Sequence, residues 1–160
     1  TTEAYLMPDA VKTLYWYGVG IYEFSNDFRN SVYYGSVTYN TNNLVINARH
    51  SGNWGGRIWQ DLYTSKELDF SRYNALKGIC ASVYSNMTNV EQGSNNASAI
   101  GIRKSAENLD PYTNLKINSE NPSLLSVDIS NVSSGHPSIA CTINNSNVNN
   151  NMYCWALWLE

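Results

Sequence analysis

The stretch that decides the fold is GSVTYNTNNLVINAR, residues 35–49. Apolar side chains alternate with polar or small ones in two runs, separated by the polar segment NTNN. The alternating apolar positions are Val37, Tyr39, Leu44, Ile46 and Ala48. A period of two places one set of side chains on one face of a strand, and a short Asn-rich segment between two such runs is typical of a turn. The stretch therefore predicts a β-hairpin.

The same alternation recurs along the chain, and no segment keeps an apolar period of 3.6 residues. Helix is predicted only as single turns, at residues 8–14, 66–73 and 105–110. The further expected strands are residues 15–24, 56–62, 76–84, 97–104, 115–118, 124–129, 138–144 and 152–159. Many short strands with short connections predict an all-β fold, a jelly-roll β-sandwich of roughly 8–10 antiparallel strands with little helix.

The end of the chain carries two contrasting segments. NNSNVNNN at residues 144–151 is rich in Asn and predicts a polar hairpin loop. MYCWALWLE at residues 152–160 is apolar at successive positions, which is typical of a central strand covered on both faces rather than an edge strand. This segment is therefore expected in the middle of a sheet.

Length and composition indicate one domain with an unusual surface. The 160 residues suit a single β-sandwich, with residues 1–13 as a linker to an upstream region. Because Thr1 stands where an initiator methionine is expected, the chain is interpreted as the C-terminal part of a longer protein. Charged residues make up 14%, whereas about 25% is typical, and Asn, Ser and Thr together make up about a third. The surface is expected to be polar but largely uncharged.

The charge pattern argues against two partner classes. The net charge is -3, and the ten Lys and Arg are scattered along the chain, so nothing resembles a footprint for a phosphate backbone. No apolar run reaches 18 residues, and no signal peptide is visible. Neither nucleic acid nor a membrane is expected as a partner.

Three cysteines, Cys80, Cys141 and Cys154, each lie within an apolar run. An odd number cannot all pair within one chain, and buried free thiols behave as small hydrophobic side chains. Free buried thiols are therefore the favoured interpretation over a disulfide, in keeping with folding in a reducing cytoplasm.

The principal candidate site is the segment RHSGNWGGRIWQD, residues 49–61. A sugar offers hydroxyl groups for hydrogen bonds and an apolar C–H face for stacking, so its site needs planar Asn or Arg donors beside an exposed aromatic ring. The expected ligand-binding residues are Arg49, His50, Asn53, Trp54 and Arg57. The alternative is that Trp54 folds back over the rim of the sandwich.

Three further aromatic residues are secondary candidates. Tyr33 and Tyr34 follow Arg29 and Asn30, but neighbours in a strand face opposite ways, so only one of the two tyrosines can belong to a given surface. Trp59 lies at alternating distance in the next strand and is more simply a core residue. The residues LYWYG at 14–18 are also favoured as core.

Catalysis and metal binding have little support in the sequence. His50 and His136 are the only histidines, no G-x-S-x-G occurs, and His136 fits a solvated loop. A glycosidase needs two carboxylates, but spacing does not select a pair among acids such as Glu23, Asp61, Glu67 and Asp69. No zinc or EF-hand motif is present, and no cofactor is expected. A structural calcium ion held by backbone carbonyls is left open, so the metal question stays unknown.

The order of elements resembles a known group of domains. LYWYG, a hairpin, LDFSRYNALKGICASV, SVDISNVSSGHPSIACTI and a closing MYCWALWLE look like the C-terminal β-sandwich modules of phage and prophage tail or tail-fibre proteins from gut Clostridia-like hosts. In these and in galactose-binding-like and carbohydrate-binding sandwiches, an aspartate, a turn, a tyrosine and an apolar strand form a unit. Here the unit is Leu68, Asp69, Tyr73 and Leu76, and a second one is Val127, Asp128 and Ile129.

The resemblance implies a non-catalytic receptor-binding module on a virion tail appendage, made in the host cytoplasm and acting outside the cell. Its partner would be a bacterial surface glycan, and avidity favours a homotrimer. One alternative is a structural virion protein, a fibre, collar or decoration domain that contacts other virion proteins. Another is a carbohydrate-binding module of a bacterial glycosidase.

Overall fold

The computed structural model of the chain describes residues 4–6, 11–18, 32–51, 58–64, 66–87, 97–105, 108–115, 119–145 and 147–160. These residues form twelve strands, and none of them is helical. Across the described ranges there is accordingly no helix that could cross a membrane. The candidate residues Asn53, Trp54 and Arg57 lie outside this part of the chain.

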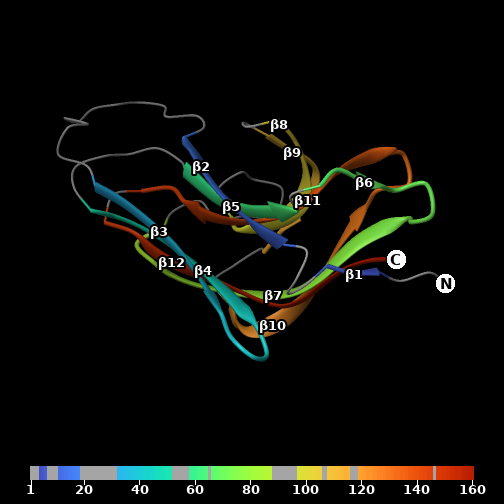
Figure 1. Cartoon of the computed structure of the whole chain (residues 1–160). Coiled ribbons are helices and arrows are strands. Elements are labelled where there is room, and N and C mark those ends of the chain that lie inside the picture. Colours follow the sequence, from blue (N-terminus) through green and yellow to red (C-terminus); the bar gives the residue numbers. More distant parts are fainter. Residues whose placement is uncertain are drawn as a thin grey trace.

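The strands form two antiparallel sheets packed face to face (Figure 1). The first sheet has the order β10-β7-β12-β4-β3, with β1 paired to β12. Its strands are β1 (Ala4–Tyr5), β3 (Val32–Tyr39), β4 (Leu44–Ser51), β7 (Ala75–Ser85), β10 (Ser119–Asp128) and β12 (Asn149–Leu159).

The second sheet has the order β2-β5-β11-β8-β9, with β6 paired to β11. Its strands are β2 (Val11–Gly18), β5 (Ile58–Thr64), β6 (Leu68–Asp69), β8 (Ala99–Ser105), β9 (Asn108–Asn114) and β11 (Ser134–Ile143). Apart from the β3–β4 and β8–β9 hairpins, most connections cross from one sheet to the other. The predicted all-β jelly-roll sandwich is confirmed.

The decisive hairpin has the expected register. Val37 pairs with Ile46 and Tyr39 pairs with Leu44, so the alternating apolar residues lie on the same side of the hairpin. Val37 packs against the core, whereas Tyr39 at the end of β3 is exposed. The NTNN segment closes the turn with a hydrogen bond from the Asn40 amide to the Asn43 carbonyl at 2.8 Å. Leu44, Ile46 and Ala48 are fully buried and join β4 to the core.

Several local predictions were wrong. Residues 11–14 and 108–110 belong to strands rather than helical turns, and residues 66–73 contain the short strand β6 followed by a turn. Leu115 lies beyond the end of β9, and the other residues of the strand expected at 115–118 lie outside the described residues. Pro111 made β9 hard to predict, because proline cannot donate to a ladder; β9 tolerates it as the last strand of its sheet.

Within the expected linker, residues 1–13, two short segments belong to the sheets. Ala4 and Tyr5 pair with Leu159 and Trp158, and Val11 pairs with Thr64. The assignment of the remaining residues of this segment to a linker stays a prediction.

The core lies between the two inner faces. Aliphatic side chains from both sheets meet there, with Phe70 at one end. The largest fully buried members are Phe70, Leu44, Ile46, Leu62, Leu76, Ile100, Ile102, Ile129, Ile139, Ile143 and Met152. The three cysteines are also fully buried, as predicted. Burial of this apolar area is the main force that holds the two layers together.

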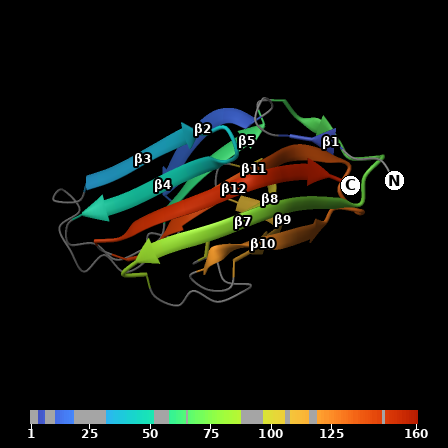
Figure 2. The ribbon, with the colours of Figure 1, turned by 90° about the horizontal axis from the view of Figure 1, so that it is seen from below.

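The closing segment is central, as predicted, since β12 pairs with β4 on one edge and with β7 on the other (Figure 2). Two details differ from the expectation. Asn149, Asn150 and Asn151 are part of the strand rather than of the preceding loop. The outer face of β12 is also not fully covered, because Tyr153, Trp155 and Trp158 are only half-buried.

A buried polar cluster centres on Asn150, whose side chain points inward and has 0% exposure. Its Nδ2 donates to Ser98 Oγ at 2.9 Å and to the Thr142 carbonyl at 2.7 Å. Its Oδ1 accepts from Ser82 Oγ at 2.8 Å. One amide thus connects β12 to β7 in its own sheet and to residues of the second sheet layer, and it fixes the register of β12.

Replacing Asn150 with Ala is expected to lower the free energy of unfolding by about 3 kcal/mol, because Ser82 Oγ, Ser98 Oγ and the Thr142 carbonyl lose a partner in the core. Urea unfolding followed by tryptophan fluorescence measures the change. Asn149→Ala is the matched control, since Asn149 is exposed on the same strand, and it should change stability by no more than about 0.5 kcal/mol. Equal stability of the two variants would contradict the role of Asn150.

Candidate functional site

The outer face of the first sheet carries an ordered row of amides along β12. Asn47 on β4 donates from Nδ2 to Asn149 Oδ1 at 2.9 Å and to Asn151 Oδ1 at 2.8 Å. The same Nδ2 lies 3.3 Å from the Asn150 carbonyl. Asn149 is exposed and Asn47 and Asn151 are half-buried. The hydrogen bonds fix the orientation of the three amides on the surface.

A pair of stacked aromatic rings continues this row. The ring centroids of Tyr153 and Trp155 are 5.9 Å apart, with an angle of 21° between the planes. The register of β12 against β7 shifts between Cys154 and Ala156, which is typical of a β-bulge. A bulge re-aims the side chains next to it, and here Trp155 and Ala156 are both half-buried. We call Asn47, Asn149, Asn151, Tyr153 and Trp155 the β12 strip.

A pocket of about 430 Å³ lies at the amide end of the strip. It is lined by Arg49, His50, Ser51, Asn147, Val148 and Asn149. Asn147 has a φ of 54°, in the left-handed region that Asn tolerates better than most residues. Asn86, which directly follows β7, donates from Nδ2 to the Asn147 carbonyl at 3.4 Å. This hydrogen bond stabilises the wall of the pocket.

A smaller hollow of about 80 Å³ lies at the aromatic end. Trp155, Leu44 and the turn of the β3–β4 hairpin line it, and Tyr39, with 51% exposure, forms part of the wall. Asn40 Nδ2 donates to Asn43 Oδ1 at 2.8 Å and stiffens the turn. This hollow combines two aromatic rings with amide groups.

The pocket and the smaller hollow lie at opposite ends of the strip, because Asn149 lines the pocket and Trp155 lines the hollow. Both lie on the central strand β12, which Figure 2 shows between β4 and β7. At about 3.3 Å per residue, the six steps from Asn149 to Trp155 span roughly 20 Å. The surface is therefore elongated along the strand.

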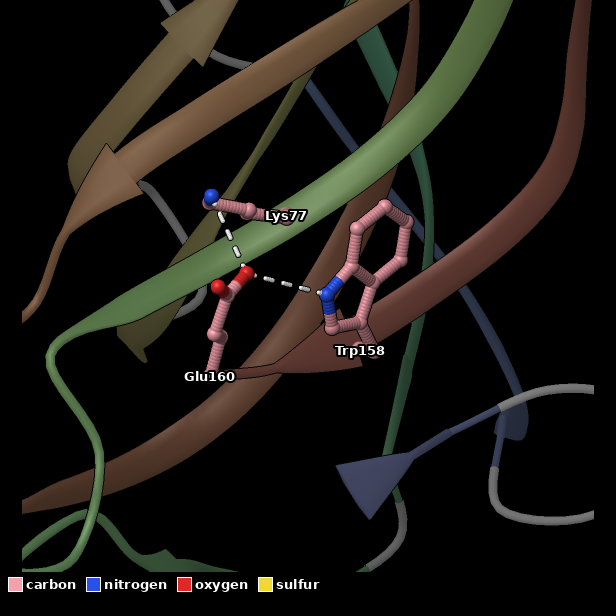
Figure 3. Close-up of polar contacts among 3 residues, drawn as sticks. All are labelled: Lys77, Trp158 and Glu160. Carbon is pink, nitrogen blue, oxygen red and sulfur yellow. Dashed lines mark hydrogen bonds and ion pairs between the residues drawn. The ribbon is translucent and has the colours of Figure 1, made fainter. Parts of the chain in front are cut away.

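Beyond the aromatic end, three side chains secure the end of the chain (Figure 3). Lys77 Nζ lies 3.0 Å from Glu160 Oε2, and Trp158 Nε1 donates to the same oxygen at 3.4 Å. These two donors lower the pKa of Glu160, with the contribution of Lys77 the larger. Because the three groups bind one another, they stabilise the end of β12 rather than present open donors.

Arg49 and His50 both line the pocket, but they differ in solvent exposure. Arg49 is exposed and pairs in register with Asn149, so its guanidinium is the cation at the pocket. His50 is only 3% exposed, and burial lowers the pKa of its imidazole. Its backbone N–H donates to the Val148 carbonyl at 2.9 Å, which joins β4 to the segment before β12. Among the described residues that line the pocket, Arg49 is therefore the positively charged one.

The structure brings together part of the predicted site. Arg49 and His50 line the pocket, whereas Asn53, Trp54 and Arg57 lie outside the described residues, so their roles stay predictions. Tyr33 and Tyr34 pair with His50 and Arg49 across β3 and β4, close to the pocket along the backbone. Trp59 is in the second sheet, paired with Thr142 and Tyr17, and so does not belong to the sheet that carries the strip.

The sequence reasoning missed the strip itself. The alternation of Tyr153 and Trp155 with Met152 and Cys154 was visible, but the outer positions were interpreted as buried because they are aromatic. The amides were missed because Asn149 and Asn151 were assigned to a loop. A search for alternating Asn and aromatic residues on one face of a predicted strand would have found both.

The second sheet carries a separate contact cluster around Tyr63. The guanidinium carbon of Arg103 lies 4.8 Å from the ring centroid of Tyr63, and the His136 ring meets Tyr63 edge-on at 5.9 Å. His136 Nδ1 is 2.7 Å from the Thr64 carbonyl. His136 is thus a half-buried residue of β11, and its predicted place in a solvated loop was wrong.

The acids considered for catalysis are engaged in local structure where they are described. Glu67 Oε1 accepts from Ser134 Oγ at 2.8 Å. Asp69 Oδ1 accepts from the Ser71 amide at 2.9 Å, and this hydrogen bond lowers the pKa of Asp69. A general acid needs a raised pKa, so Asp69 does not fit that role. Among the described residues, no three His, Cys, Asp or Glu side chains are placed to hold a metal ion.

Comparison with family models and with curated proteins finds no match. Similar solved structures include a carbohydrate binding module of family 29, 13% identical, covering 92% of this chain and 89% of that one, with a TM-score of 0.45. A mutant of a family 29 module is 12% identical over 92% of both chains, with a TM-score of 0.45. Another is 12% identical over 93% and 92%, with a TM-score of 0.46. A similarity of this size does not assign the chain to that family.

The stability of the protein is expected to fall as the pH is lowered through about 6.5, the ordinary pKa of histidine. Because burial lowers the pKa of His50 in the folded state, the unfolded chain binds more protons in this range. The contribution is fully present above pH 6.5 and is lost below it. Urea midpoints measured from pH 7.5 to 5.0 test this, with His50→Gln as the comparison. If the urea midpoint of the variant changes with pH as steeply as that of the unmodified protein, His50 is not the group responsible.

Proposed function

We propose that this chain is a non-catalytic carbohydrate-binding module whose ligand lies along the β12 strip. The observation that carries the proposal is the row of three hydrogen-bonded amides in line with a stacked pair of aromatic rings on one face of the central strand. Each element meets one of the two chemical demands of a sugar. The rings offer an apolar surface to C–H groups, and the amides offer donors and acceptors to hydroxyl groups.

Preorganisation adds to this chemistry. Asn47 holds the amides of Asn149 and Asn151 through their Oδ1 atoms, so both groups are oriented before a ligand arrives. The rings of Tyr153 and Trp155 are likewise ordered against each other. Side chains that are ordered in the free protein lose little conformational entropy on binding, which favours affinity for a weakly interacting ligand.

The shape of the surface favours an extended ligand. A hollow at each end of a strip about 20 Å long suits a chain of several sugars that follows β12. Arg49 at the larger pocket adds a cationic donor that can bind hydroxyl or carboxylate groups in a bidentate manner. The binding is thus expected to strengthen with oligosaccharide length.

Binding is favoured over hydrolysis by the residues of the surface. A glycosidase of the usual kind needs a pair of carboxylates that flank the scissile bond. The described residues that form the strip, the pocket and the smaller hollow include no Asp or Glu. The described part of the site thus offers groups that recognise a sugar and no carboxylate pair.

The biological setting is proposed from the sequence resemblance alone. On this basis the module belongs to a phage tail fibre or another receptor-binding protein of the virion, recognises bacterial surface glycan and acts as a homotrimer. The carbohydrate-binding module of a bacterial glycosidase is an alternative with the same site, and the upstream sequence distinguishes the two by a fibre shaft or a catalytic domain. Light scattering of the purified protein tests the trimer.

A structural virion protein is the rival from another class. In that case the half-buried rings of the strip would be covered by a neighbouring subunit rather than by a glycan. The elongated hollows and the ordered amides favour a polymer ligand, because a protein interface tends to be richer in apolar contact at its centre.

Substitution of Trp155 by Ala is expected to weaken glycan binding roughly 2- to 10-fold, since a lost stacking contact is worth about 0.5–1.5 kcal/mol and the ring also lines the smaller hollow. Asn151→Ala is expected to weaken binding by a similar factor through a lost hydrogen bond and a less ordered Asn47. A glycan array identifies the ligand, and titration calorimetry with oligosaccharides of increasing length measures the affinities.

Leu124→Ala is the matched control, because Leu124 is 62% exposed on β10 of the same sheet but outside the strip. Its affinity should equal that of the unmodified protein. Binding that survives Trp155→Ala and Asn151→Ala in folded protein would place the site elsewhere. No binding to any glycan at high display density would favour the structural virion protein.

A further inference from the structure

Two of the three cysteines face each other across neighbouring strands. Cys80 on β7 and Cys154 on β12 are direct partners in the antiparallel register. Both side chains point into the core and have 0% exposure. The neighbouring Cys154 thiol is one of the causes that raise the pKa of Cys80. Cys141 is on β11 in the second sheet, where it pairs with Gln60.

The spacing of such a pair suits a covalent bond. Directly opposite residues in antiparallel strands have Cα atoms about 4.5–5.5 Å apart, and a disulfide accepts Cα separations of about 4.4–6.8 Å. A glycine lies beside one of the two sulfur atoms. A Cβ atom on Gly78 would lie 3.4 Å from Cys80 Sγ and 3.2 Å from Ile100 Cδ1. The absence of a side chain at Gly78 therefore leaves space next to the Cys80 sulfur.

We propose that Cys80 and Cys154 are a disulfide site that joins β7 to β12 when the chain folds in an oxidising compartment. The co-reactant is a small disulfide such as oxidised glutathione. Two successive thiol–disulfide exchanges form one S–S bond in the protein and release two molecules of the reduced thiol. The two protein thiols are oxidised, the small disulfide is reduced, and the two protons pass to the released thiols.

The structure also indicates when the bond forms. The hydrogen bond to Cys154 and burial in the core raise the pKa of the Cys80 thiol well above its ordinary value. Since the thiolate is the species that attacks a disulfide, the folded protein reacts very slowly at neutral pH. The bond therefore forms while the chain is still open, and the closed core then protects it from reduction.

The Cys80–Cys154 bond would lie next to the β12 strip. Cys154 stands between Tyr153 and Trp155, directly beneath the stacked rings, and its Sγ donates to the Ala156 carbonyl across the bulge at 3.3 Å. The bond would hold this part of β12 to β7 and keep the bulge in place. This inference does not depend on the ligand, so it stands or falls independently of glycan binding.

The test is to refold the reduced, denatured protein with a mixture of oxidised and reduced glutathione, then to unfold it and alkylate the free thiols with iodoacetamide. We expect a single alkylated cysteine, Cys141, and a peptide pair that joins Cys80 to Cys154 in mass spectrometry. The oxidised protein should melt roughly 5–10 °C above the reduced one, because the bond closes a long loop of the unfolded chain.

Single cysteine variants show whether the bond joins Cys80 to Cys154 or includes Cys141. Cys141→Ala should still form the bond and keep the melting difference, whereas Cys80→Ala and Cys154→Ala should abolish both. Folded protein is confirmed in each case by circular dichroism. Three alkylated cysteines after oxidative refolding, or a bond that includes Cys141, would overturn the proposal. Because mass spectrometry reports the bond itself, a variant of lower stability still gives a decisive result.

Discussion

The structure depends on the placement of β12 between β4 and β7, and on the buried amide of Asn150 that fixes its register. Successive side chains of a strand point to opposite faces of the sheet. A shift of the strand pairing by one residue would therefore turn every inward residue of β12 outward. Asn150 prevents this because its hydrogen bonds to Ser82, Ser98 and Thr142 are satisfied in only one register. The apolar contacts of Met152, Cys154 and Leu157 are compatible with that register as well.

The consequence of this register is found on the other face of the strand. With Asn150 and Met152 directed inward, Asn149, Asn151 and Tyr153 are directed outward, next to Asn47 of β4. The register of β12 thus determines both which of its side chains pack in the core and which lie on the outer surface. Trp155 lies two residues after Tyr153 and therefore on the same outer side of the strand. The bulge after Cys154 then changes the alternation, so that beyond it Leu157 and Leu159 are the residues directed into the core.

The surface is recognised by its geometry rather than by a motif. Amides and aromatic rings occur throughout this chain, and the alternation of Asn and aromatic residues on β12 does not by itself show how their side chains are held. What distinguishes them is order: a hydrogen-bonded amide row, a stacked ring pair and a hollow at either end. The low charge of the surface is consistent with a neutral ligand held by many weak contacts, with Arg49 as the cation at its larger pocket.

The sequence by itself determined the all-β class, the β3–β4 hairpin and the central position of the last strand, because alternation with a period of two is a local property of a strand. It also named Arg49 and His50 as candidate binding residues, and both line the pocket, but their part in binding stays a prediction. It did not determine that Asn149 to Asn151 extend β12, that His136 is half-buried, or that the rings of Tyr153 and Trp155 reach the outer surface. Those features depend on partners more than 50 residues away in the chain, such as Asn47, Ser82 and Thr64. Only the tertiary structure decides them, since the energy that makes an Asn a strand residue or a core residue comes from hydrogen bonds to those distant groups.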